Sequence, residues 1–395
     1  MTRRHRTAAL GAATLITLLA GCSGGGTAAE PEPAEEETPH GYVEGAEEAA
    51  EPQLRLVVAD TDTGRVRLLD LITEEVTELG EVPGVDGVMG DGRFAYLSSS
   101  HEGTTEVFDS GVWTVDHGDH NHYYRTASGD VGALDLSDPA HVVTDTALTS
   151  VTTGRGASLL LERAELEDGT VATAGVRVDE GTTVLPYQGA LVAVDTDGTV
   201  RALDRDGEPQ ADPGATCTDP DGAALTRRGL VVGCSEGTLH VTEEDGDLTA
   251  STLPHPGEGR GGPFLHRSGS AVLAALPGDD TLWVLDLAVP EWRAHDQPGT
   301  VAATTTGEEG PVLALADDGT LRALDPRTGE EEAATALLDT VDPEHPPTLA
   351  ADTSRAYVSD PGAGVVHEID YADDLRVART LEPGIAPHLM IQTGR

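Results

Sequence analysis

Short stretches of alternating apolar and polar residues recur along the chain from Leu54 onward. Each follows a turn, as in Gly64-Arg-Val-Arg-Leu-Leu-Asp70 and Gly319-Thr-Leu-Arg-Ala-Leu-Asp325. Alternation with a period of two places apolar side chains on one face of a strand and polar side chains on the other. The pattern therefore predicts many short, half-buried β-strands, each beginning at a tight turn.

The spacing of these stretches predicts the architecture. Copies begin at residues 64, 103, 198, 237, 280, 319 and 364. Neighbouring copies lie 39 to 45 residues apart, and the interval from 103 to 198 has room for one more. A repeat of about 40 to 45 residues made of short strands is typical of a β-propeller blade. We therefore expect an all-β fold over residues 54–395, a β-propeller with eight blades, and no α-solenoid or βαβ arrangement.

The N-terminal segment, residues 1–21, has the features of an export signal. Arg3, Arg4 and Arg6 precede an apolar run that ends in Leu19-Ala20-Gly21-Cys22. This ending resembles a bacterial lipobox, which implies cleavage before Cys22 and diacylation of its thiol. The alternative is an ordinary signal peptide with an incidental cysteine. We expect an extracytoplasmic protein, anchored to the cell membrane through lipid.

Residues 22–53 have the composition of a tether. Between Glu30 and Glu51 there are nine acidic residues and no basic one, among Pro and Ala. Like charge and low hydrophobicity favour an extended, disordered chain. We expect this segment to hold the propeller away from the membrane. It also contains His40, which could form a second metal site with nearby glutamates.

The charge of the chain narrows the possible partners. Asp and Glu number 70 against 24 basic residues, for a formal net charge of −46. Such a chain repels nucleic-acid phosphates and anionic lipid headgroups, so we expect no nucleic acid among its partners. Cations remain possible ligands. Because aromatic residues make up only 3% of the chain, the core must be built mainly from Val, Leu and Ala.

Two cysteines remain once Cys22 is assigned to lipid. Cys217 and Cys234 form an even pair in a chain expected to lie outside the cytoplasm. In an oxidising compartment such a pair favours a disulfide. Metal binding by the pair is less favoured, because neither cysteine has a CxxC partner.

The run Asp116-His-Gly-Asp-His-Asn-His-Tyr-Tyr124 contains three of the fourteen histidines. On a strand, His120 and His122 would point to the same face and could bind one ion. A turn at the glycine would allow His117 or Asp119 to complete the set. Imidazole and carboxylate ligands suit zinc above all, although copper and nickel are chemically possible. The alternative is a hydrated, histidine-rich surface loop.

A tetrahedral site needs a further ligand, and three histidines precede candidate inner strands of the propeller: His141, His345 and His388. Strands of this kind surround the central channel of a propeller. His141 is the closest in sequence and is our preferred addition. For each of the three, a solvated or hydrogen-bonded turn histidine is the alternative.

The segment Asp60-Thr-Asp-Thr-Gly64 is faintly similar to a calcium loop but lacks the later ligands, so we interpret it as a repeat turn.

The run from Asp116 to Tyr124, in a repeat protein with an export signal, resembles the AztD family of zinc metallochaperones. The segment His40-Gly-Tyr-Val-Glu-Gly-Ala-Glu-Glu48 is similar to the mobile N-terminal segment of that family. The likeness extends from about His40 to the C-terminus, and the HGDHxHYY core is its sharp motif. It implies a β-propeller that binds Zn²⁺ and passes it to the substrate-binding protein of a zinc ABC importer. It also implies that His117, His120 and His122 bind the metal and that the protein is not an enzyme.

Two other classes of function remain as alternatives. A propeller enzyme, a metal-dependent hydrolase or oxidoreductase, would need an open coordination position and a placed acid or base. A metal-free interaction scaffold at the cell surface would need neither. A propeller by itself implies none of these activities.

Overall fold

The computed structural model describes residues 45–118, 120–210, 212–278 and 280–395. These residues belong to one structural unit, His40–Arg395. The expected signal segment 1–21, the lipidation site Cys22 and the histidine at position 40 lie outside the described residues, as does most of the expected tether.

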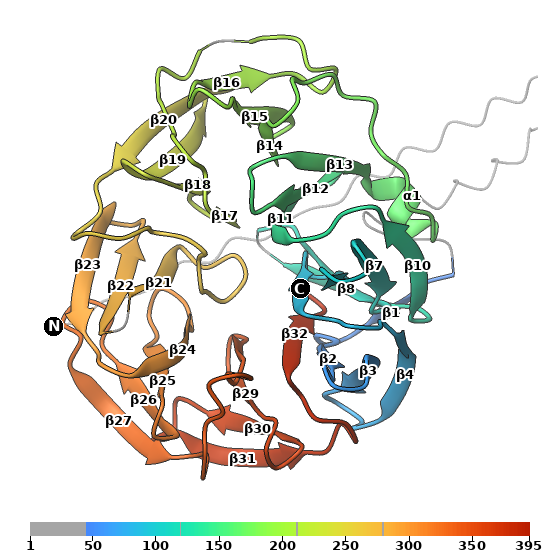
Figure 1. Cartoon of the computed structure of the whole chain (residues 1–395), viewed down its shortest axis with the longest axis vertical. Coiled ribbons are helices and arrows are strands. Elements are labelled where there is room, and N and C mark those ends of the chain that lie inside the picture. Colours follow the sequence, from blue (N-terminus) through green and yellow to red (C-terminus); the bar gives the residue numbers. More distant parts are fainter. Residues whose placement is uncertain (1–44, 119, 211, 279) are drawn as a thin grey trace, which may run out of the picture. The chain divides into compact units, whose positions relative to one another are not determined.

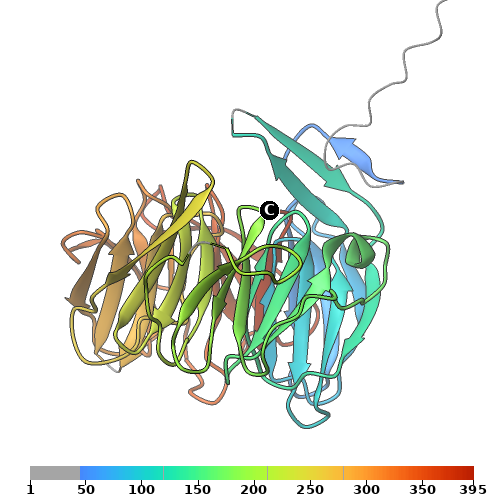
Figure 2. The same cartoon turned by 90° about the horizontal axis from the view of Figure 1, so that it is seen from above.

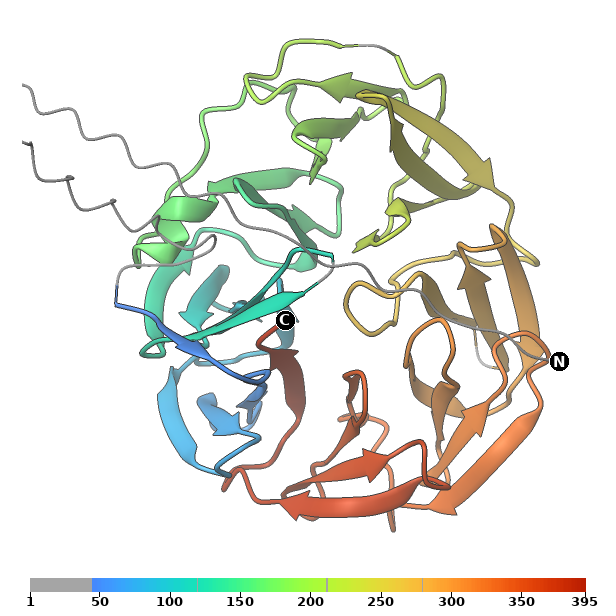
Figure 3. The same ribbon diagram turned by 180° about the vertical axis from the view of Figure 1, so that it is seen from behind.

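The described residues form nine antiparallel sheets, most of which are arranged in a ring (Figures 1 and 3). The first ring sheet consists of β32 (Leu389–Thr393), β2 (Arg55–Ala59), β3 (Arg65–Asp70) and β4 (Val76–Glu81). The second consists of β10 (Gly129–Leu134), β7 (Thr104–Asp109), β6 (Phe94–Ser99) and β5 (Gly87–Gly90). The next three are β11 (Pro139–Thr144), β12 (Leu148–Thr153), β13 (Ser158–Glu162); β14 (Thr183–Tyr187), β15 (Ala190–Val194), β16 (Val200–Leu203); and β17 (Ala223–Thr226), β18 (Gly229–Cys234), β19 (Gly237–Glu244), β20 (Asp247–Leu253). The last three are β21 (Val272–Gly278), β22 (Thr281–Asp286), β23 (Glu291–Asp296); β24 (Thr300–Thr305), β25 (Val312–Ala316), β26 (Thr320–Leu324), β27 (Glu331–Ala336); and β28 (Leu349–Ala351), β29 (Ala356–Asp360), β30 (Val365–Asp370), β31 (Arg376–Leu381).

The predicted all-β propeller is confirmed. The strands expected from the alternating pattern are present, and their burial alternates as expected: in β3, Val66 and Leu68 are buried while Arg65 and Arg67 are not. Five of the nine sheets have the four strands of a standard blade, and the other four have three strands within the described residues. The count of eight blades stays a prediction.

The ring is closed by strands from distant parts of the chain. The C-terminal strand β32 pairs with β2, so that Ala59 lies opposite Leu389 and Arg55 lies opposite Thr393. One sheet therefore holds the first and the last strands of the ring. Closure of the ring therefore depends on contacts between residues more than 300 positions apart in the sequence.

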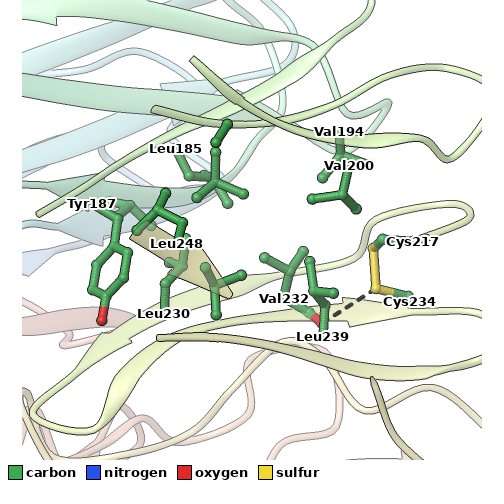
Figure 4. Close-up of a cluster of buried hydrophobic side chains, with 14 residues drawn as sticks. Leu185, Tyr187, Val194, Val200, Cys217, Leu230, Val232, Cys234, Leu239 and Leu248 are labelled. Atoms are coloured by element: carbon green, nitrogen blue, oxygen red, sulfur yellow. Dashed lines mark hydrogen bonds between the residues drawn. A yellow bond between two sulfur atoms is a disulfide. The ribbon is translucent and has the colours of Figure 1, made fainter. Parts of the chain in front are cut away.

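Each part of the core is a layer between neighbouring sheets. Figure 4 shows one of them, where Leu185 and Val194 face Leu230 and Val232. The predicted disulfide is confirmed beside this layer, with both cysteines buried and 17 residues apart. In the chain-entropy model a bridge closing a loop of this length contributes about 3 kcal/mol by restricting the unfolded chain.

Two elements were not expected from the sequence. The segment interpreted as tether contains a strand, β1 (Glu47–Ala49), and a short helix, α1 (Arg163–Glu167), follows β13. The helix is one and a half turns long and buries Leu166, which is too little for a helical periodicity to appear in the sequence. Among the described residues, no helix has the length and apolar character needed to cross a membrane.

Candidate metal centre

The histidine-rich run forms a β-hairpin that is separate from the ring sheets. β8 (Val112–Asp116) and β9 (Asn121–Arg125) pair so that Val115 lies opposite His122. β1 adds a third strand on the far side of β9. Figure 2 shows this sheet, with the hairpin in teal and β1 in blue, standing out from one face of the ring. At the tip, Gly118 has a φ of 85°, a conformation that glycine adopts without strain.

Aromatic and polar contacts attach the base of the hairpin to the propeller. Trp113 is buried and stacks on Tyr124 with ring centroids 5.4 Å apart. The guanidinium of Arg93 lies 3.9 Å from the centroid of the same indole ring. The Thr114 hydroxyl donates a hydrogen bond of 2.7 Å to the carbonyl of Gly394. The hairpin is therefore a supported element, as the aromatic residues flanking the histidines suggested.

Three histidines converge at the hairpin tip. One ring nitrogen from each of His117, His120 and His122 lies within 4.8 Å of the others. The Nε2 atoms of His120 and His122 are 3.1 Å apart. Two ligands of a tetrahedral zinc ion with Zn–N bonds of 2.0–2.1 Å stand about 3.3 Å apart, so this pair is nearly at coordination distance. The backbone N–H of His117 donates a hydrogen bond of 3.0 Å to the backbone carbonyl of His120, which holds the turn closed.

Glu48 of β1 orients one of these ligands. Its Oε1 lies 2.7 Å from Nδ1 of His122. A carboxylate only accepts, so Nδ1–H donates and the Nε2 lone pair points toward His120. A carboxylate behind a ligating imidazole fixes the ring and raises its basicity. This residue was missed at the sequence level, because the glutamates near His40 were considered only for a separate site.

The two faces of the hairpin have different surroundings. His117 and His120 are exposed, and the side chain of His122 is 29% exposed. On the other face, Asp116, Asn121 and Tyr123 line the central cavity, whose volume is about 1150 Å³. The metal-binding groups are thus exposed at the tip of the hairpin. A bound ion there would be accessible to another protein.

The fourth expected ligand, His141, is not part of this cluster. It lies in β11, is buried, and lines the central cavity. Both of its ring nitrogens lack a hydrogen-bond partner among the described residues. Burial lowers the pKa of His141 to about 4. Position 119, the carboxylate considered as a ligand, lies outside the described residues.

A second group of potential ligands lies elsewhere in the ring. It consists of Asp60, Asp62 and His388, with ligand atoms within 4.8 Å of one another. The ring of His345 lies against that of His388, with centroids 4.4 Å apart and the ring planes tilted by 36°. The sequence predicted that these histidines precede inner strands, but the two aspartates were interpreted as a repeat turn. Sequence reasoning had no signal for their proximity to His388.

Comparison with known proteins supports the fold and the stated resemblance. The chain matches no protein-family model and no curated protein sequence. Two solved structures of AztD from Citrobacter koseri, one of them the apo form, match with a TM-score of 0.71 and 19% identity, over 87% of this chain and 98% of theirs. The dihydro-heme d1 dehydrogenase NirN in complex with DHE matches with a TM-score of 0.52 and 16% identity, over 84% of this chain and 74% of its own. The chain thus has the fold of AztD, the protein whose family its histidine motif resembles.

Proposed function

We propose that this chain is an extracytoplasmic zinc metallochaperone that delivers Zn²⁺ to the substrate-binding protein of a zinc ABC importer. The observation that carries the proposal is the convergence of three imidazoles at the exposed tip of a supported hairpin. Three nitrogen ligands bind zinc while leaving one position for a ligand from another molecule. The buried disulfide fits a protein of an oxidising compartment.

Transfer by ligand exchange follows from the differences among the three ligands. His122 is held by Glu48 and is partly covered, whereas His117 and His120 are exposed at the turn. An incoming ligand of the partner would take the open position first. The two exposed imidazoles would then leave in turn, and His122 last. The direction of transfer depends on the relative zinc affinities of the two proteins, since the same exchange operates both ways.

The surroundings of the cluster favour delivery over catalysis. A zinc hydrolase needs a placed acid or base beside the open position and a site from which water is excluded. The tip of the hairpin that carries the histidines is exposed, and the large cavity lies against the opposite face of the hairpin. The enzyme alternative makes a distinct prediction, namely metal-dependent turnover on ester, lactone or alcohol substrates.

A competition titration with a zinc chelator tests the site. We expect the folded domain to bind one zinc ion tightly at the hairpin, and the His120→Ala/His122→Ala variant to lose that ion. His101→Ala is the matched control, because His101 is an exposed histidine whose Nδ1 lies 2.8 Å from Glu102. Unchanged tight binding in the double variant would refute the site.

A transfer experiment tests the role. Zinc-loaded protein is mixed with a zinc-free substrate-binding protein of a zinc importer, in the presence of a chelator that traps released ion. Direct delivery predicts that zinc reaches the partner despite the trap. If all zinc reaches the chelator instead, the protein binds zinc but does not deliver it.

A further inference from the structure

Arginine side chains line one end of the central cavity. The cavity has a volume of about 1150 Å³, and three arginines are among its lining residues: Arg227, Arg267 and Arg395. Arg227 follows β17 and lies 3.0 Å from Asp116 of the hairpin. Gly394, which precedes Arg395, accepts a hydrogen bond from the Thr114 hydroxyl. The positive charge is therefore at the end of the cavity beside the hairpin, in a chain with 70 acidic and 24 basic residues.

Backbone contacts hold Arg267 at the wall of the cavity. It lies in the segment between β20 and β21, which reaches toward the centre of the ring (Figure 1). Its Nε donates a hydrogen bond of 2.8 Å to the carbonyl of Thr306. The guanidinium passes over Gly307, where a Cβ atom would lie 2.6 Å from Nη2. Its ion pair with Glu308 spans 3.9 Å, so the remaining donors of Arg267 are weakly engaged.

The guanidinium of Arg395 has still fewer contacts. Its Nη1 and Nη2 atoms lie 3.5 and 3.4 Å from the carbonyls of Ala351 and Gln392, and its Nε is buried without a hydrogen-bond partner in the described part of the chain. Burial lowers the pKa of Arg395 to about 10, against the opposing effect of Asp352 and together with the repulsion of Arg267. A buried guanidinium with unused N–H groups is costly unless an acceptor reaches it.

The nearby carboxylate of Asp352 is directed elsewhere. Its Oδ1 accepts the backbone N–H groups of Ser354 and Arg355 at 2.7 and 2.8 Å. Its Oδ2 accepts the hydroxyl of Tyr357 at 2.9 Å. These bonds hold the carboxylate in its own turn after β28. Asp352 therefore acts on Arg395 through space but does not supply the acceptor that Nε of Arg395 lacks.

Other walls of the cavity indicate a ligand with a carbon body. Gln392 is 2% exposed and His141 is 8% exposed, and among the described residues neither the Gln392 Oε1 nor either His141 ring nitrogen has a hydrogen-bond partner. Buried polar atoms of native proteins are paired with protein, water or ligand. Between these polar points the lining includes apolar side chains, such as Val88, Leu349 and Met390. The mixture of an apolar wall and a few polar groups is typical of a small-molecule site.

We propose that the hairpin end of the central cavity binds a small organic carboxylate, held by the guanidinium groups of Arg267 and Arg395. Paired N–H groups of a guanidinium match the two oxygens of a carboxylate. The ligand supplies the acceptor that Arg395 lacks, and its carbon body lies against the apolar part of the wall. The cavity is as large as the larger small-molecule pockets and exceeds what an inorganic ion fills. This site is separate from the three histidines at the hairpin tip and requires no metal ion.

Isothermal titration with L-malate tests the proposal, in a low-salt buffer free of other carboxylates and of phosphate. We expect one equivalent to bind to the folded protein and to the His120→Ala/His122→Ala variant, which excludes binding of malate through zinc at the hairpin. Arg395→Met should weaken binding about 10-fold or more, because a charge-assisted hydrogen bond is lost. Arg327→Met is the matched control, since it removes the same charge from an exposed turn, and it should keep the affinity within about twofold.

A second variant and a stability measurement complete the design. Arg267→Lys keeps the charge but loses the paired donors, so it should weaken malate binding as well. Without malate, Arg395→Met should melt no lower than the original protein, because the guanidinium makes few contacts; malate should raise only the melting temperature of the original. Absence of malate binding, or equal binding by Arg395→Met and the original, would overturn the site. Binding of phosphate through Arg395 without binding of malate would overturn the carboxylate class. Each of these outcomes leaves the zinc proposal untouched.

Discussion

At the scale of the residue, the contact between Glu48 and His122 controls the proposed zinc site. Glu48→Gln keeps the size of the side chain but replaces a charged acceptor by a weaker neutral one. Loss of a carboxylate behind a metal-bound imidazole costs roughly 10- to 100-fold in affinity. We expect a decrease in zinc affinity within that range, measured by chelator competition at constant pH and salt.

The neighbouring glutamate provides the control for this prediction. Glu47 lies on the same strand but pairs with Arg125 at 2.9 Å, so it does not contact the histidines. Glu47→Gln removes the same charge from the same exposed segment. We expect less than about a threefold change in zinc affinity, because an exposed ion pair contributes little. Equal losses in the two variants would mean that net charge matters and the contact with His122 does not.

The histidines could be predicted from the sequence and the glutamate could not, for a physical reason. Spacing by two on a strand places His120 and His122 on one face, and this information is local. Glu48 reaches His122 through the pairing of β1 with β9, a contact across 74 positions. The three-residue strand lies in an acidic segment whose composition favours disorder. No pattern within that segment identifies its partner.

At the scale of the element, the hairpin combines a rigid base with a replaceable tip. Its base contributes buried Trp113, while the tip residues are exposed. Replacing residues 117–120 by Asn-Gly would close the same strands with a favoured two-residue turn. We expect loss of tight zinc binding, because only His122 of the three ligands remains. Isothermal titration of the purified variant measures this loss.

The stability of that variant shows whether the hairpin tip serves only as a metal site or also supports the fold. Because the tip buries no apolar side chain, we expect its melting temperature to remain within about 3 °C of the original, which corresponds to less than about 2 kcal/mol in a domain of this size. A large decrease would show that the turn supports the fold. Loss of zinc binding could then no longer be assigned to the missing imidazoles.

The elements themselves were predicted to different degrees. Strands that follow the repeated turns, such as β3 and β26, were predicted closely because alternation and turn residues are local signals. The helix α1 is too short to show a period, and β1 has no apolar alternation. The proximity of Asp60 and His388 depends on ring closure, which no local signal encodes.

At the scale of the whole molecule, a buried histidine in the central cavity makes the free energy of unfolding depend on pH. His141 lines this cavity, both of its ring nitrogens lack a hydrogen-bond partner in the described part of the chain, and burial lowers its pKa to about 4 from the usual 6.5. The unfolded chain therefore binds a proton at a higher pH than the folded protein does. The contribution of His141 to the free energy of unfolding is fully present above about pH 6.5 and decreases as the pH falls toward 4. The decrease amounts to about 3 kcal/mol over that range.

Replacing this histidine should make the propeller more resistant to acid. His141→Leu fills a similar volume and removes both the unpaired nitrogens and the titration, so we expect equal or higher stability at pH 7.5. Between pH 7.5 and 4.5 the variant should lose about 2 to 3 kcal/mol less than the original protein, measured from urea unfolding with a chelator present. His101→Leu, a substitution at an exposed histidine, should follow the original pH dependence. If His141→Leu follows it as well, the imidazole is reached by protons in the folded state. The cavity would then be hydrated at β11, and acid sensitivity would arise from the carboxylates.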